Sequence, residues 1–69
     1  MEFDDLENRF TYHAPKGDQA SRYESIRQVA LGFAILLNRD CPDSREKSVA
    51  LTKLEEVVMW ANASIARNE

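Results

Sequence analysis

The 69-residue sequence has little of what small domains commonly use to stay folded. It holds one cysteine, Cys41, so no disulfide can form within the chain and a zinc site built on cysteine pairs is excluded. With one histidine, His13, neither a metal site nor another cofactor is expected. Because chains this short often depend on metals, disulfides or association, the composition predicts by elimination that the chain associates with copies of itself.

Positive charge and long apolar runs are also scarce. Nine Lys and Arg residues against twelve Asp and Glu give a net charge of −3, which disfavours long nucleic acids because they require a broad basic surface. The longest apolar run, Val29 to Leu37, is interrupted by Gly32 and is too short to cross a membrane. The beginning, MEFDDLENRF, is acidic and does not resemble a signal peptide. We therefore expect a cytoplasmic protein without a membrane partner.

The stretch from Ser44 to Asn68 contains neither proline nor glycine. We predict a helix over 43–68, begun by Asp43 or Ser44, with Asp43 and Glu46 forming a capping box. Its apolar residues recur at the i, i+3, i+4, i+7 spacing of an amphipathic helix. They are Ala50, Leu51, Leu54, Val57, Val58, Ala61 and Ile65, with Met59 and Trp60 at the edge of the stripe.

An earlier helix is predicted over 18–38, with Asp18 as its N-cap. Asn38 is suited to the left-handed conformation that ends many helices. Gly32, inside this helix, would allow another helix to approach closely. The apolar residues form a seam of coiled-coil spacing, made of Tyr23, Ile26, Ala30, Phe33 and Leu37.

The remaining residues, 1–17, are expected to form an N-terminal arm. Phe3 and Leu6 indicate either one helical turn or a frayed end, and Phe10 to Gly17 is expected to lie extended over a helix. The aromatic residues of this stretch either pin the arm to the hairpin or leave one ring free for a ligand.

Because the connection between the two predicted helices is short, they become antiparallel neighbours. The sequence thus predicts one all-α domain over 1–69, an antiparallel helical hairpin assembled as a homo-oligomer.

No set of residues indicates catalysis. His13 has no nucleophile in a recognised arrangement, and Glu55 and Glu56 are adjacent on a helix and point in different directions. Asn62 lies in the apolar stretch MWANASI, so its amide must find partners in the hairpin or across an oligomer interface. Two interpretations remain open at this point. Asn62 fixes the register and the arginines make surface ion pairs, or an aromatic ring and an arginine together bind a nucleotide.

The runs FTYHAPKGDQASRYESIR and LTKLEEVVMWANASIARNE resemble the two halves of the helical hairpin domain of phage anti-defence sponges. The more specific motif is W-A-N-A followed by I-A-R-N, and the resemblance spans Arg9 to Glu69. These sponges include the anti-CBASS cyclic-oligonucleotide sponge and a related antagonist of Thoeris immunity. The resemblance implies a non-catalytic protein that binds cyclic nucleotide messengers and thereby keeps bacterial suicide effectors silent. It also implies a homohexamer with ligands held between protomers.

The resemblance assigns roles to four residues of a cyclic dinucleotide pocket. Tyr12 matches an aromatic residue that stacks on a base, and Arg27 falls where the family places a basic residue against the phosphate. His13 falls beside them at the base edge, and Arg9 is a further candidate for the same pocket.

A second, separate pocket of the family takes cyclic trinucleotides. Arg67 matches a basic residue there, and Ser25 falls near a small residue of that pocket. The adjacent Glu24 would oppose a phosphate if it occupied that place. Cyclic dinucleotides are therefore the chief expected ligand.

Three other interpretations stay open. The chain could bind a Thoeris messenger of the cyclic ADP-ribose type, although it lacks the extra elements that build that pocket in larger relatives. It could be a small helical oligomerisation or regulatory module without a ligand. It could also be an enzyme that degrades the messenger.

Overall fold

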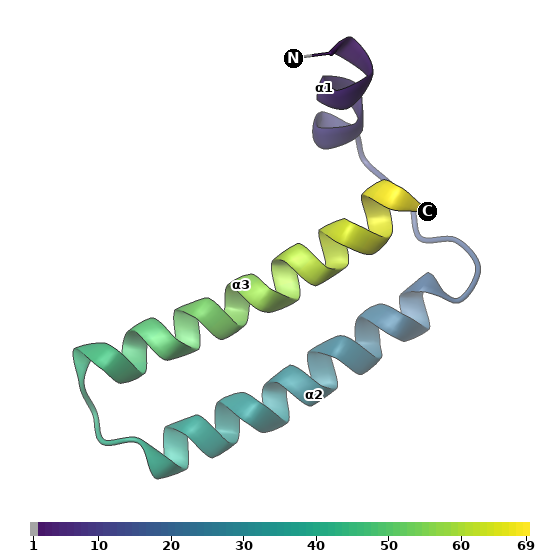
Figure 1. The fold of residues 1–69 in the computed structure, drawn as a ribbon. Coiled ribbons are helices and arrows are strands. Elements are labelled where there is room, and N and C mark those ends of the chain that lie inside the picture. The colour runs from purple at the N-terminus through teal and green to yellow at the C-terminus, as the bar shows by residue number, and fades with distance from the viewer. Residues whose placement is uncertain (1) are drawn as a thin grey trace.

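Residues 2–69 are described by a computed structural model, and they form three α-helices and no strand. Helix α1 comprises Phe3–Phe10, α2 comprises Gln19–Asp40, and α3 comprises Arg45–Asn68. Helices α2 and α3 lie side by side and run antiparallel, and α1 stands beside the C-terminal end of α3 (Figure 1). The prediction of an all-α helical hairpin is confirmed.

The seam between α2 and α3 is narrower than the apolar stripes of the two helices. Their facing side chains are half-buried, whereas Phe33 and Val57, expected in the contact, are 51% and 59% exposed. One antiparallel neighbour covers only part of a helix surface, so the rest of each stripe faces outward. The half-buried apolar residues of the seam are Tyr23, Ile26, Ala30, Ala34, Leu37, Ala50, Leu51, Leu54, Val58, Ala61 and Ile65.

Helix α2 runs two residues past its predicted end at Asn38. No described residue other than glycine has a positive φ, so the prediction that Asn38 ends the helix in the left-handed conformation is wrong. The helix ends at Asp40, and the C-cap residue Cys41 has an extended backbone with φ of −101° and ψ of 132°. Pro42 explains this ending, because a proline disfavours the helical conformation of the residue before it.

Ser44 begins α3. Its hydroxyl accepts a hydrogen bond from the backbone N–H of Lys47 at 3.1 Å, which confirms Ser44 as the N-cap. The expected capping box between Asp43 and Glu46 is wrong, because the Asp43 carboxylate pairs with Lys47 Nζ at 2.9 Å. Lys47 Nζ also donates to the Asn38 carbonyl at 3.0 Å, so this side chain ties the two ends of the turn together.

The start of α2 differs from a simple cap. Asp18 occupies the N-cap position without a capping hydrogen bond, and its carboxylate instead accepts from Arg22 Nε at 3.2 Å. The turn before it requires Gly17, which has a φ of +58°. Gln19 then accepts a hydrogen bond from the Lys16 backbone N–H at 3.1 Å and is only 3% exposed.

Residues Phe3–Phe10 form a regular helix, where an arm with at most one helical turn was expected. Asp4 and Asp5 lie in its first turn and Arg9 in its last, an arrangement that suits the helix dipole. Asp5 and Arg9 also face each other at 4.0 Å, one helical turn apart. Local charge placement thus favours the helix although its apolar residues contact little of the hairpin: Phe3 and Phe10 are 74% and 81% exposed.

The molecule is a flat slab without a core. Its principal extents are 45 × 29 × 13 Å, and its radius of gyration of 15.2 Å exceeds the value of about 11 Å expected for a compact chain of this length. No apolar residue within 2–69 is buried. Gly32 faces open space within the chain, so the close approach predicted for it does not occur between α2 and α3. None of the helices described is long and apolar enough for a transmembrane span.

We predict that Ser44→Ala destabilises the protein by about 1 kcal/mol, because the first turn of α3 loses its cap. Chemical unfolding followed by circular dichroism, at a fixed protein concentration, measures the change. Ser48→Ala is the matched control, since the Ser48 hydroxyl bonds the Ser44 carbonyl inside the helix and caps nothing. Equal stability of the two variants would contradict the role assigned to Ser44.

Candidate functional site

The segment that follows α1 is held to the hairpin by two hydrogen bonds that meet at Asn8. Asn8 Nδ2 donates to the backbone carbonyl of Arg67 at 3.1 Å, near the end of α3. His13 Nε2 lies 2.8 Å from the Asn8 carbonyl and donates to it, because a carbonyl can only accept. Asn8 was missed in the sequence, since a single polar residue in a short helix carries no periodic signal. It fixes where the residues between Arg9 and His13 lie.

An open hollow of about 350 Å³ lies between the N-terminal segment and the hairpin. All four residues predicted for the cyclic dinucleotide pocket line it, so segments far apart in the sequence converge there. The volume falls at the lower end of the range for small-molecule sites. The lining consists of Arg9, Thr11, Tyr12, His13, Tyr23, Arg27, Asn62, Ala63, Ala66 and Arg67.

The lining of this hollow is basic in a chain that is acidic overall. It includes Arg9, Arg27 and Arg67 and no carboxylate. Two of these guanidinium groups have carboxylate neighbours just outside the lining: Arg27 lies 3.6 Å from Glu24, and Arg9 lies 4.0 Å from Asp5. Both pairs are largely exposed, so each is weak and can be exchanged for a stronger anion.

The rings of this region differ in how they are packed. Tyr12 is 84% exposed, although it lines the hollow, and it therefore offers a free aromatic face. Phe10 is similarly exposed, so these two rings do not pin the segment to the hairpin. His13 is half-buried and contributes the polar attachment through Asn8.

Asn62 contributes an amide to the lining of the hollow. Its carbonyl oxygen is buried and has no hydrogen-bond partner among the described residues. A buried acceptor without a partner costs about 1–3 kcal/mol. The hairpin therefore does not supply the partner that this amide requires.

The two residues predicted for the trinucleotide pocket lie apart in the single chain. Arg67 lines the same hollow as Tyr12 and Arg27, where a separate pocket was expected. It reaches this hollow because Asn8 attaches the N-terminal segment to the carbonyl of Arg67 itself. Ser25 lies instead at the edge of an apolar groove of about 480 Å³. The other residues of this groove are Ile26, Val29, Ala30, Phe33, Leu54, Val57 and Val58.

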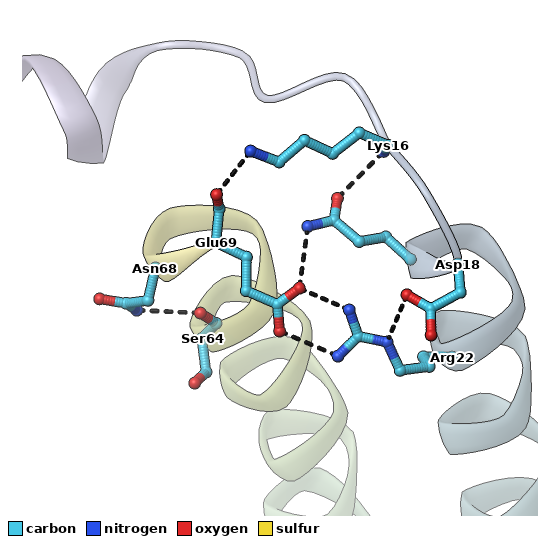
Figure 2. Close-up of polar contacts among 7 residues, drawn as sticks. Lys16, Asp18, Arg22, Ser64, Asn68 and Glu69 are labelled. Atoms are coloured by element: carbon cyan, nitrogen blue, oxygen red, sulfur yellow. Dashed lines mark hydrogen bonds and ion pairs between the residues drawn. The ribbon is translucent and has the colours of Figure 1, made fainter.

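A polar network closes the open end of the hairpin (Figure 2). Arg22 donates through both terminal nitrogens to the Glu69 carboxylate, one of these bonds measuring 2.9 Å. Gln19 Nε2 donates to the same carboxylate at 3.2 Å, and Lys16 Nζ donates to the Glu69 backbone oxygen. The start of α2 is thereby joined to the end of α3, directly beside the hollow.

The network changes the acidity of its members. Hydrogen bonds from Arg22, and then from Gln19, lower the pKa of Glu69 to about 2. The same contact with Glu69 raises the pKa of Arg22 above its ordinary value. The Glu69 carboxylate therefore stays charged, and occupied by Arg22, down to strongly acidic pH.

The described residues contain no cluster of three or more side chains suited to a metal ion. The groups around the hollow are instead a free ring, guanidinium groups, an imidazole and an amide. Such groups bind and orient an anionic, aromatic ligand, with charge-assisted contacts from the arginines.

The family model described as the hairpin domain of Acb2/Tad1 matches residues 3–66 of the chain. The match includes all three helices almost entirely, and with them every residue of the hollow except Arg67. No curated protein and no solved structure matches the chain.

We predict that Glu69→Gln lowers Tm by a few degrees at neutral pH, because the charged carboxylate no longer holds Arg22. The folded-state pKa of Glu69, about 2, lies below its ordinary value of 4.5. Its stabilising effect is therefore complete above about pH 4.5 and is lost as pH falls toward 2. Thermal unfolding of both proteins between pH 2 and 7 should show the two curves converging at low pH.

Glu55→Gln serves as the control, because this carboxylate of α3 has no ion pair with another residue of 2–69. A Tm difference between Glu69→Gln and the parent that is constant across this pH range would contradict the role of the Glu69 charge.

Proposed function

Because the chain belongs to the Acb2/Tad1 hairpin-domain family, the anti-CBASS and anti-Thoeris sponges, we propose that it sequesters cyclic oligonucleotide messengers, chiefly cyclic dinucleotides. The family is one of binding domains, and cyclic nucleotides are the ligands that it implies. One observation carries the proposal for this chain: the exposed ring of Tyr12 lines a hollow that also holds Arg27 and contains no carboxylate.

The chemistry of the ligand fits these two side chains. A base has a flat face that stacks on an aromatic ring, and a phosphodiester is an anion that a guanidinium group binds with charge-assisted hydrogen bonds. In the proposed complex Tyr12 stacks on a base and Arg27 exchanges Glu24 for a phosphate. His13 contacts the base edge, and Arg9 adds positive charge on the same side.

The ligand also fits an assembly of two copies. A cyclic dinucleotide carries two bases and two phosphates, so a two-fold interface would present one Tyr12 and one Arg27 to each half. The small size and openness of the hollow in one chain support a site that a second copy completes.

The surface of the single chain supports assembly. Its accessible area of 5523 Å² exceeds the value of about 4,400 Å² expected for a compact chain of 7.9 kDa. The excess of about 1,100 Å² is comparable to what one partner buries in a standard interface. We place the contact at the apolar groove around Val29 and Val57, which are 76% and 59% exposed. The family resemblance favours a hexamer.

Other ligands of the family rank below cyclic dinucleotides. Cyclic trinucleotides would use Arg67 and Ser25 from a pocket that several copies build, because one chain does not bring these two residues together. The Thoeris messenger ranks lower still, because its pocket is expected to need elements beyond a helical hairpin. A sponge for bacterial immune messengers would act in the cytoplasm of the host, returning each messenger unchanged.

Tyr12→Ala and Arg27→Ala should each weaken binding of a cyclic dinucleotide by about 1–3 kcal/mol per site, because each removes half of the stack-and-charge pair. Isothermal titration calorimetry measures the loss. Arg39→Ala is the matched control, since this arginine lies at the opposite end of α2 and pairs with Asp40.

Two outcomes would contradict the proposal. A parent protein that binds no cyclic dinucleotide, or binds it equally well after either substitution, would favour an interaction module without a ligand. Failure to recover intact messenger from the heat-denatured complex would indicate an enzyme instead of a sponge.

Val29→Lys should reduce the assembly to smaller species, because it places a charge in the apolar groove proposed as the contact. Light scattering at micromolar concentration measures the mass, with a hexamer expected for the parent. Val49→Lys is the control, since Val49 is exposed and lies outside the groove. A monomeric parent would contradict the assembly.

A further inference from the structure

We infer that Asn62 selects the base of the ligand and favours adenine. The inference deepens the proposed function and rests on it. Asn62 lines the hollow together with Tyr12 and Arg27, and its carbonyl oxygen is buried without a partner among residues 2–69. The Asn62 carbonyl oxygen is therefore an acceptor that none of the described residues uses.

The other well-packed amides of the chain are engaged. Asn8 donates to the carbonyl of Arg67, and Gln19 uses both ends of its amide, on Lys16 and Glu69. Asn62 differs from them by standing where the hairpin faces the hollow. We assign its unmet acceptor to the ligand site.

The chemistry of the amide identifies the base. An asparagine side chain presents one acceptor and one donor side by side, which match the N6 amino group and N7 of adenine. Guanine and hypoxanthine present two acceptors at the corresponding edge, so the amide carbonyl would stay without a partner. Because this oxygen is buried in the single chain, the inference requires a rotation about the Cβ–Cγ bond of Asn62 that turns the oxygen toward the base.

The three groups then divide the recognition of one nucleotide. The ring of Tyr12 supports the flat face of any base, and Arg27 holds the phosphate whatever the base is. Asn62 distinguishes the exocyclic group at the base edge, next to the contact proposed for His13. Affinity and base preference are thus assigned to different side chains.

The test compares cyclic di-adenylate with cyclic di-inosinate, which have the same charge and differ at the 6-position of the base and in the proton on N1. The parent should bind cyclic di-adenylate about tenfold more tightly or better, as expected for a bidentate amide–base pair. Asn62→Leu should reduce this preference to about twofold or less while keeping affinity for cyclic di-inosinate. It should also raise Tm, because an apolar group of similar shape replaces an acceptor without a partner.

Asn68→Leu is the matched control, since Asn68 belongs to the same helix, lies outside the hollow and bonds the Ser64 carbonyl at 2.9 Å. It should keep the adenine preference. A parent that binds neither ligand overturns the proposed function, and this inference with it.

Three results would overturn the inference alone. They are a parent that binds both ligands equally, an Asn62→Leu variant that keeps the preference, and an Asn62→Leu variant whose mass by light scattering differs from that of the parent. The last would make Asn62 an interface residue.

Discussion

The single seam between α2 and α3 determines the shape of this molecule and how much of its apolar surface is exposed. Each of these two helices covers one stripe of the other. Helix α1 does not cover the remaining surface, because it stands beside the end of α3 (Figure 1). The apolar area left over is therefore large, with Val29 and Val57 mostly exposed. The same geometry leaves both broad faces of the slab open for binding.

Polar contacts hold the two helices together at the ends of the hairpin, and apolar packing holds them together along its length. Lys47 ties the turn, and the pair of Arg22 and Glu69 joins the opposite end. Asn8 attaches the N-terminal segment to α3 with a hydrogen bond of 3.1 Å. The Asn8 hydrogen bond is short-range and directional, so it fixes where Tyr12 lies more narrowly than a weak apolar contact would.

The two long helices, α2 and α3, could be predicted from the sequence because their apolar residues repeat with the helical period. The family resemblance named four residues that line one hollow, and their role in binding stays a prediction. Details that depend on competition between neighbouring residues could not be predicted from the sequence. Asn38 and Pro42 both can end a helix, and the structure is needed to show that Pro42 decides. Asp43 and Ser44 both can cap one, but the carboxylate is taken by Lys47. The partner of Asn8 is 59 residues away, a separation over which no local pattern acts.

Adjacent residues of α2 belong to different faces of the slab, since Ile26 lines the apolar groove and Arg27 lines the hollow. A neighbouring copy seated in the apolar groove and a messenger bound in the hollow would therefore act on the same helical turn. Whatever factor the neighbour applies to messenger affinity, the messenger must apply to self-association. Messenger capture would then change with the concentration of the protein in the cell.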